Sequence, residues 1–218
     1  MKIGVPKEIK PQETRIGLTP ESVKDLISNG HQVLVENKGG HEAGFENSHY
    51  VSAGAKIVDK AEDIFNDCEI IVKVKEPLSN EVKMIRENQI VFTYLHLAAA
   101  KELTQGLINS KGVCIAYETV TDQNGRLPLL APMSAVAGRM SVQAGAHCLE
   151  KNQKGRGLLL GGAPGVEGGT VVILGGGVVG ENAAIIATGM QAKVHIVDKS
   201  EKRIDELTKK FGDKIIPQ

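Results

Sequence analysis

A glycine-rich turn in the last quarter of the sequence has the spacing of a phosphate-binding site. It reads Gly175-Gly176-Gly177-Val178-Val179-Gly180, follows an aliphatic run at 171–174 and leads directly into a helical pattern. In such a turn Gly175 permits the tight bend, Gly177 lets the backbone approach a pyrophosphate, and Gly180 lets the helix pack closely on the strand. The helix N-terminus then presents unpaired N–H groups and a positive dipole to the phosphates. These features predict a dinucleotide site.

An acidic residue closes the next predicted strand. Asp198 lies 23 residues after Gly175, near the spacing of about 20 at which an acid binds the adenosine ribose. Its carboxylate can accept hydrogen bonds from the ribose hydroxyls and would repel a 2′-phosphate, so NAD is favoured over NADP. Arg203, which could accommodate that phosphate, weakens the preference. The alternative is a βαβ unit that binds another nucleotide or none.

Three polar residues in the first half of the chain follow predicted strands. Arg15 can clamp a carboxylate with two parallel hydrogen bonds, Lys75 can neutralise a carboxylate or polarise a carbonyl, and His96 can transfer protons. Because ligands of parallel α/β sheets gather beyond the carboxyl ends of the strands, the three together suit a small α-amino or α-keto acid. Taken singly, Arg15 and Lys75 are typical of solvated surface charges, and His96 is equally compatible with a hydrogen-bonded core histidine.

The elements that must position these residues alternate between strand and helix. Thr19-Pro20 and Gly30 are start and stop signals for the first helix. Alternation of this kind predicts an α/β fold, with two Rossmann-like, doubly wound parallel-sheet domains at residues 1–128 and 129–218, the second truncated. Strand patterns occupy residues 2–6, 32–36, 69–74, 89–94, 113–116, 170–174, 193–197 and 214–216, and helical patterns occupy 21–29, 103–109, 133–149, 178–190 and 201–211.

The helical pattern at 133–149 carries two interior glycines, Gly138 and Gly145. Each interior glycine costs a helix about 1 kcal/mol relative to alanine. Close approach of another helix or a sheet is the physical reason that would offset this cost. We interpret the segment as the helix that links the two domains.

Composition excludes several other classes of function. The 218 residues are 41% hydrophobic and 24% charged, and 26 Lys and Arg balance 26 Asp and Glu, which argues against nucleic acid and membrane as partners. No apolar run approaches the roughly 20 residues of a membrane span, and the N-terminus lacks a secretory signal. The cysteines, Cys68, Cys114 and Cys148, show no metal-ligand spacing and are predicted to be buried free thiols. We therefore expect a soluble cytoplasmic protein without a metal site.

The whole sequence resembles the N-terminal part of members of the alanine dehydrogenase and nicotinamide nucleotide transhydrogenase family. It resembles the alanine dehydrogenase branch, because the transhydrogenase branch is not expected to carry the segment around His96. The resemblance rests on Gly4-Val5-Pro6-Lys7-Glu8-Ile9-Lys10, residues 13–20, Tyr94-Leu95-His96-Leu97-Ala98, Ala116-Tyr117-Glu118-Thr119-Val120, residues 132–139 and residues 171–187.

The resemblance implies reversible oxidative deamination of L-alanine to pyruvate and ammonia, with hydride transfer from Cα to NAD in a homohexamer. Arg15 and Lys75 would bind substrate, and His96 would be the acid and base. Met133 would line the substrate pocket. The resemblance also assigns contacts with NAD to Ser134, Val178, Val179, Asp198 and Arg203.

The sequence departs from the family pattern at two positions and in length. Ala135 replaces a usual Glu and Gln191 replaces a usual Gly, with small expected effects on stability or packing. Family members extend past residue 218, into the rest of the nucleotide domain, a second catalytic Asp and the last helices of the first domain. Two alternatives therefore stay open: the NAD-binding subunit of a proton-translocating transhydrogenase, or a non-catalytic NAD-binding fragment.

Overall fold

The computed structural model describes all 218 residues, which form two compact units at Met1–Leu127 and Pro128–Gln218. Both units have the α/β architecture that the alternating patterns predict, with a wholly parallel sheet in each. No helix is long and apolar enough to cross a membrane.

The first unit contains a six-stranded sheet in the order β3-β2-β1-β4-β5-β6. The order reverses between β1 and β4, which is the point where ligands bind in doubly wound sheets. The five strands predicted in this unit are present within one or two residues, whereas the three-residue β3 is too short to produce a recognisable pattern. The strands are β1 (Lys2–Val5), β2 (Gln32–Glu36), β3 (Lys56–Val58), β4 (Ile70–Val72), β5 (Ile90–Thr93) and β6 (Val113–Ala116).

Alternation along the strands builds a core on each face of this sheet. Val33 and Val35 of β2 pack with Val23 and Tyr50, while Leu34 between them packs on the other face with Phe65. The Thr19 hydroxyl accepts the Ser22 N–H and begins the first helix, as predicted. The helices are α1 (Pro20–Ser28), α2 (Asn47–Ser52), α3 (Ala61–Asp67), α4 (Ser79–Val82) and α5 (Lys101–Ser110), and α2, α3 and α4 were not predicted.

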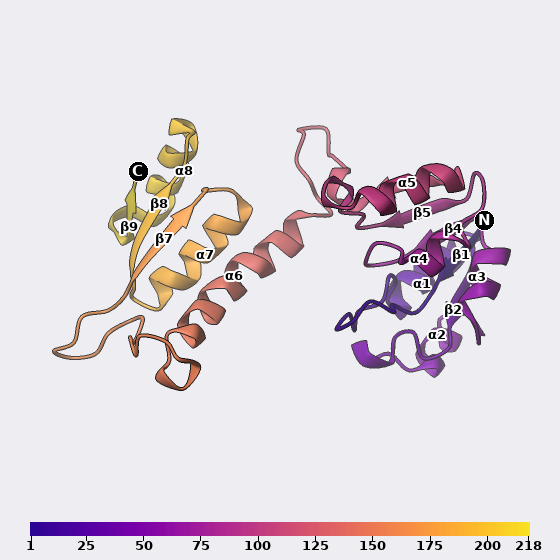
Figure 1. The fold of residues 1–218 in the computed structure, drawn as a ribbon, viewed down its shortest axis with the longest axis horizontal. Helices are drawn as coiled ribbons and strands as arrows, with labels where there is room; N and C mark the ends of the chain where they lie inside the picture. The colour runs from indigo at the N-terminus through magenta and orange to yellow at the C-terminus, as the bar shows by residue number, and fades with distance from the viewer. The chain divides into compact units, whose positions relative to one another are not determined.

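The second unit contains a three-stranded sheet in the order β7-β8-β9. Its strands are β7 (Thr170–Leu174), β8 (Lys193–Val197) and β9 (Ile215–Pro217), and its helices are α6 (Ala131–Cys148), α7 (Val178–Gly189) and α8 (Glu201–Phe211). One core, which includes Ile173, Ala184, Ile196 and Leu207, joins the sheet to these helices. Figure 1 shows α6 lying along α7.

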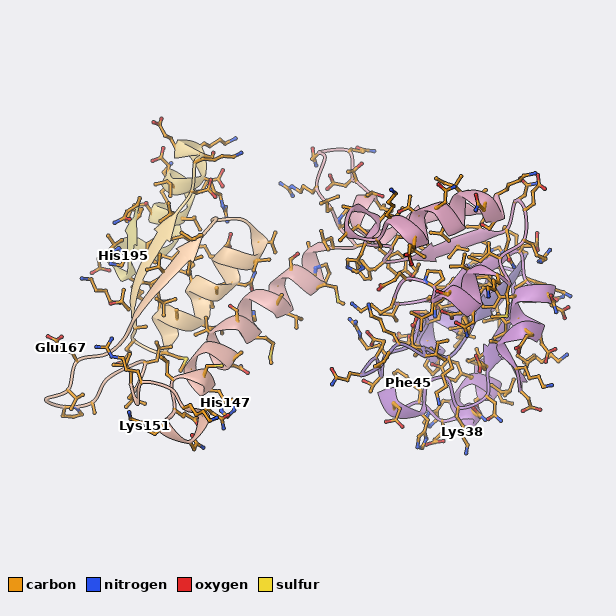
Figure 2. The ribbon with its side chains drawn as sticks, viewed as in Figure 1. Lys38, Phe45, His147, Lys151, Glu167 and His195 are labelled. Atoms are coloured by element: carbon orange, nitrogen blue, oxygen red, sulfur yellow. The ribbon has the colours of Figure 1, made fainter.

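Only one face of the second sheet is covered, so this unit is not doubly wound within the 218 residues. On the opposite face Val172 and Leu174 are 59% and 81% exposed. His195 of β8, labelled in Figure 2, is in register with Val172 on β7 and Ile216 on β9 and belongs to this open face. An exposed apolar face is the expected consequence of a parallel sheet that has helices on one side only.

The two interior glycines of α6 have different surroundings. A methyl group on Gly138 would overlap the Val179 carbonyl oxygen and the Asn182 side chain of α7, as close helix approach requires. Gly145 has open space around the position of a Cβ, so the prediction of close approach is wrong there. A second correction concerns the cysteines: Cys68 is buried, but Cys114 is half-buried and Cys148 is exposed, because α6 presents Cys148 to solvent.

Substituting alanine at these two glycines should change stability in opposite directions. Gly145→Ala should stabilise the second unit by up to about 1 kcal/mol, the helix-propensity difference, whereas Gly138→Ala should destabilise it by about 1–3 kcal/mol through overpacking. Urea unfolding followed by far-UV circular dichroism measures both changes. A stabilised Gly138→Ala variant would contradict the packing of α6 on α7.

Candidate functional site

The predicted substrate residues lie beyond three neighbouring strands of the first sheet. Arg15 is in the loop after β1, Lys75 follows β4 and His96 follows β5, and these strands are adjacent in the order β1-β4-β5. The carboxyl ends of parallel strands share one edge of the sheet, and β1 and β4 flank the reversal in strand order. The topology thus brings the three segments to the position where such sheets bind ligands.

Glu13 holds the guanidinium of Arg15. Arg15 Nε donates to Glu13 Oε1 over 2.7 Å and Nη2 donates to Oε2 over 2.6 Å, a bidentate pair. These hydrogen bonds, assisted by the charges of Arg15 and Lys75, lower the pKa of Glu13 to about 2. Glu13 is therefore ionised at neutral pH. Its carboxylate is bonded to Arg15 and also interacts with the charge of Lys75.

His96 is not a core histidine, because its side chain is 53% exposed. Its backbone is left-handed (φ 52°, ψ 37°), a conformation uncommon for residues other than glycine. Glu118, just after β6, stabilises it by accepting the N–H groups of Leu95 and His96 over 3.0 and 2.7 Å. Burial raises the pKa of Glu118, but these donors outweigh burial and lower it below its usual range. The Tyr94 ring stacks against the imidazole with centroids 6.0 Å apart.

Beneath Lys75 lies a buried ionic triad that the sequence interpretation missed. Lys73 Nζ is 3.1 Å from Glu8 Oε2 and 2.8 Å from Glu81 Oε1, and the three side chains are only 1–3% exposed. The other oxygen of Glu8 accepts the N–H groups of Val74 and Lys75 over 2.6 and 3.3 Å. Glu8, from the loop after β1, therefore fixes the backbone that carries Lys75. The signal was present in Ile71-Val72-Lys73-Val74, since a charge within a buried apolar run requires a partner.

The glycine-rich turn of the second unit has the predicted backbone form. Gly175 has a φ of +94°, and a methyl group on Gly180 would overlap the Gly175 carbonyl oxygen. Around Gly177 the position of a Cβ is open, and Val178 and Val179 in the first turn of α7 are exposed. The turn and the helix N-terminus thus leave room for a pyrophosphate, and the residues present fit a dinucleotide.

Asp198 and Arg203 both bind the turn itself. Asp198 Oδ2 accepts the Gly176 N–H over 2.6 Å and Oδ1 accepts the Ser200 N–H over 2.9 Å. These two donors lower the pKa of Asp198, so its carboxylate is ionised. Arg203 Nε donates to the Gly176 carbonyl over 2.6 Å, and its terminal nitrogens pair with Glu181 and Glu206. The guanidinium is thus engaged by the turn and by two acids.

The other residues singled out in the sequence lie in the second unit. Met133 and Ser134 are half-buried in the first turn of α6. Gln191 adopts a φ of 64°, the left-handed form in which glycine is favoured. Among the 218 residues no group of three or more His, Cys, Asp or Glu side chains is arranged to hold a metal ion.

Comparison with known proteins gives two family matches that cover almost the whole chain. Residues 4–137 match the N-terminal domain and residues 141–217 the C-terminal domain of the alanine dehydrogenase/PNT family. Alanine dehydrogenase from Halomonas elongata is 52% identical over 97% of this chain and 57% of its own length. That from Bacillus subtilis is 53% identical over 99% of this chain and 56% of its own. The chain therefore spans a little over half the length of these relatives.

Solved structures give the same relationship. An L-alanine dehydrogenase structure matches with a TM-score of 0.91 and 53% identity, over 100% of this chain and 60% of that one. A transhydrogenase from Sinorhizobium meliloti matches with a TM-score of 0.81 at 23% identity, over 100% of this chain and 61% of its own, and so shares the fold. On both the sequence matches and the fold, the chain belongs to the alanine dehydrogenase/PNT family.

Proposed function

We propose that this chain is part of an NAD-dependent enzyme for the reversible oxidative deamination of L-alanine to pyruvate and ammonia. The observation that carries the proposal is the placement of Arg15, Lys75 and His96 beyond adjacent strand ends at the reversal of strand order. The names of the relatives support the choice of alanine.

Each of the three residues has a distinct role in this reaction. Arg15, already oriented by Glu13, binds the substrate carboxylate. Lys75 polarises the carbonyl oxygen of pyruvate. In the direction of deamination it contacts the oxygen that becomes this carbonyl when the imine is hydrolysed. His96 takes up and returns the protons that accompany imine formation and hydrolysis. NAD, when bound, accepts the hydride from the substrate Cα.

The second unit supplies the NAD site in this proposal. The N–H groups at the start of α7, including those of Val178 and Val179, face the pyrophosphate, and Gly175, Gly177 and Gly180 shape the turn. Asp198 accepts the ribose hydroxyls, and Arg203 steadies the turn through Gly176. Ser134 contacts NAD and Met133 lines the substrate pocket. The proposal includes assembly of the protein as a homohexamer in the cytoplasm.

The function is tested by following NADH formation with the purified chain, L-alanine and NAD, and by measuring NAD binding in calorimetry. Alanine-dependent turnover that His96→Ala removes supports the proposal. NAD binding without any turnover favours the alternative of a non-catalytic NAD-binding fragment. Turnover that does not depend on L-alanine, measured in the protein that contains this chain, contradicts the proposal and favours a transhydrogenase subunit.

Asp198→Asn should weaken NAD binding and narrow the preference for NAD over NADP. The amide can offer an oxygen to only one of the two donors, Gly176 N–H and Ser200 N–H, and it no longer repels a 2′-phosphate. We expect the Kd for NAD to rise about 10-fold or more, the scale of a lost charge-assisted hydrogen bond. Calorimetry with both dinucleotides measures the change, and Asp205→Asn, an exposed acid of α8, is the control. An unchanged ratio of the Kd for NADP to the Kd for NAD would rule out a role of Asp198 in the preference for NAD.

A further inference from the structure

Glu76, the residue after Lys75, lies between a lysine and the proposed catalytic histidine. One of its carboxylate oxygens, Oε1, forms an ion pair with Lys10 from the loop after β1. The other, Oε2, is 3.4 Å from His96 Nδ1. The three residues come from the ends of β1, β4 and β5, the adjacent strands that define the site.

Glu76 Oε2 is buried and has no hydrogen-bond partner. A buried carboxylate oxygen without a donor is unfavourable, and the imidazole Nδ1, 3.4 Å away, is a group that can donate to it. Burial raises the pKa of Glu76, but Lys10, the backbone N–H of Glu76 itself and His96 together outweigh burial and lower the pKa below its usual range, so this oxygen is an acceptor at neutral pH.

We propose that Glu76 is the positioning residue for His96: its Oε2 accepts the Nδ1–H and thereby leaves Nε2 as the unprotonated nitrogen that meets the substrate. The inference rests on the proposed function and identifies the group that sets the tautomer of its acid and base. Lys10 holds Oε1, and this fixes which carboxylate oxygen faces the ring. A carboxylate that orients a catalytic imidazole through Nδ1 is the arrangement that makes a histidine an effective base.

Two other groups contact His96 at positions other than Nδ1. Glu118 uses its oxygens on the backbone N–H groups of Leu95 and His96. Tyr94 contacts the imidazole through its ring. Glu76 is therefore the acidic side chain placed to select the tautomer.

The decisive variant is Glu76→Gln, which preserves the shape of the side chain. Lys10 requires an acceptor, so the amide oxygen will face Lys10 and the amide nitrogen will face His96. An N–H donor opposite Nδ1 favours the opposite tautomer, with the hydrogen on Nε2. Adding Lys10→Met to Glu76→Gln removes the demand for an acceptor, lets the amide oxygen turn to Nδ1–H and should restore the original tautomer.

The tautomer is measured directly by ¹⁵N NMR of histidine-labelled protein at about pH 9, where an ordinary imidazole is neutral. The His96 signals are those missing from His96→Ala. We expect hydrogen on Nδ1 in the unsubstituted protein, on Nε2 in Glu76→Gln, and again on Nδ1 in the double variant. Glu87→Gln, which alters an exposed pair with Lys111, should leave the spectrum unchanged.

The NMR measurement of the tautomer requires no turnover, so it tests the inference even where the proposed function fails. With turnover, Glu76→Gln should lower kcat by about 10²–10⁴-fold, the scale of a base held in the wrong tautomer, with little change in the KM for L-alanine, and the double variant should recover part of the loss. The same His96 tautomer in the unsubstituted protein and in Glu76→Gln would overturn the inference. So would a kcat loss that Lys10→Met fails to relieve.

Discussion

Replacing His96 with alanine is expected to lower kcat for L-alanine oxidation by about 10²–10⁴-fold, the usual contribution of a positioned acid or base. The affinity for NAD should not change, because the residues proposed to bind NAD lie in the second unit. His96 is more than half exposed and packs into neither core of its unit, so the loss should be catalytic and not structural.

The backbone at His96 strengthens this expectation. A non-glycine residue in the left-handed region carries strain, and strain of this kind is retained where the surrounding structure enforces it. Here Glu118 enforces it through two backbone N–H groups. His96→Asn is a useful second variant, because asparagine tolerates the left-handed conformation but cannot transfer protons at neutral pH.

The matched control for His96 is His147→Ala, at the exposed end of α6, where the imidazole pairs only with Glu150. Steady-state rates and NAD titrations on all three variants separate the roles. If His96→Asn and His147→Ala retain equal activity, His96 is not the acid and base. If His96→Ala loses NAD affinity together with rate, its effect is not confined to proton transfer.

The second large effect is expected from Lys73→Met, which should destabilise the first unit by about 3–5 kcal/mol, the penalty for leaving a buried charge without its partner. Lys73 is the cation between Glu8 and Glu81, and all three side chains are inaccessible to solvent. Methionine fills much of the space of lysine, so the loss reflects uncompensated carboxylates more than a cavity.

Tyrosine fluorescence measures this effect selectively. The protein has no Trp, and its three tyrosines, Tyr50, Tyr94 and Tyr117, all lie in the first unit. Lys111→Met removes a cation from an exposed pair with Glu87 and should cost at most about 1 kcal/mol. Equal urea midpoints for the two lysine variants would contradict the buried triad.

A triple variant separates the contribution of charge to stability from that of packing. Combining Lys73→Met with Glu8→Gln and Glu81→Gln removes all three charges, and replacing a whole buried ionic group is often close to neutral in stability. We expect the triple variant to recover stability relative to Lys73→Met alone. It should still bind substrate less well, because the backbone N–H groups of Val74 and Lys75 lose their charged acceptor.

Features that depend on neighbours within one βαβ unit could be predicted from the sequence alone. Gly175, Gly180 and Asp198 belong to a continuous strand-turn-helix-strand segment, and each role is set by a local backbone requirement. The position of Arg15, Lys75 and His96 at one edge of the first sheet was predictable for a related reason. Parallel strands place their carboxyl ends at one edge, so the residues that follow the strands are expected to lie near one another there.

The local sequence pattern did not predict which way individual residues of a helix point. Gly138 and Gly145 lie in the same helix and obey the same propensity, yet only Gly138 faces α7. Cys148 has mostly apolar neighbours in sequence and is nevertheless exposed at the end of α6. The direction in which a helical residue points depends on which partner covers the helix, and the sequence of the helix does not specify that partner.

The sequence by itself therefore determined the α/β class, the glycine-rich turn and the residues that end the strands, because these follow from local conformation and periodicity. Only the tertiary structure decided which charges meet beneath and around them. Lys73 with Glu8, Glu76 with Lys10, and His96 with Glu118 join residues separated by 65, 66 and 22 positions. These pairs form because β1 lies beside β4 and β5 lies beside β6. Strand order comes from the packing of the whole unit, and residue spacing along the chain does not encode it.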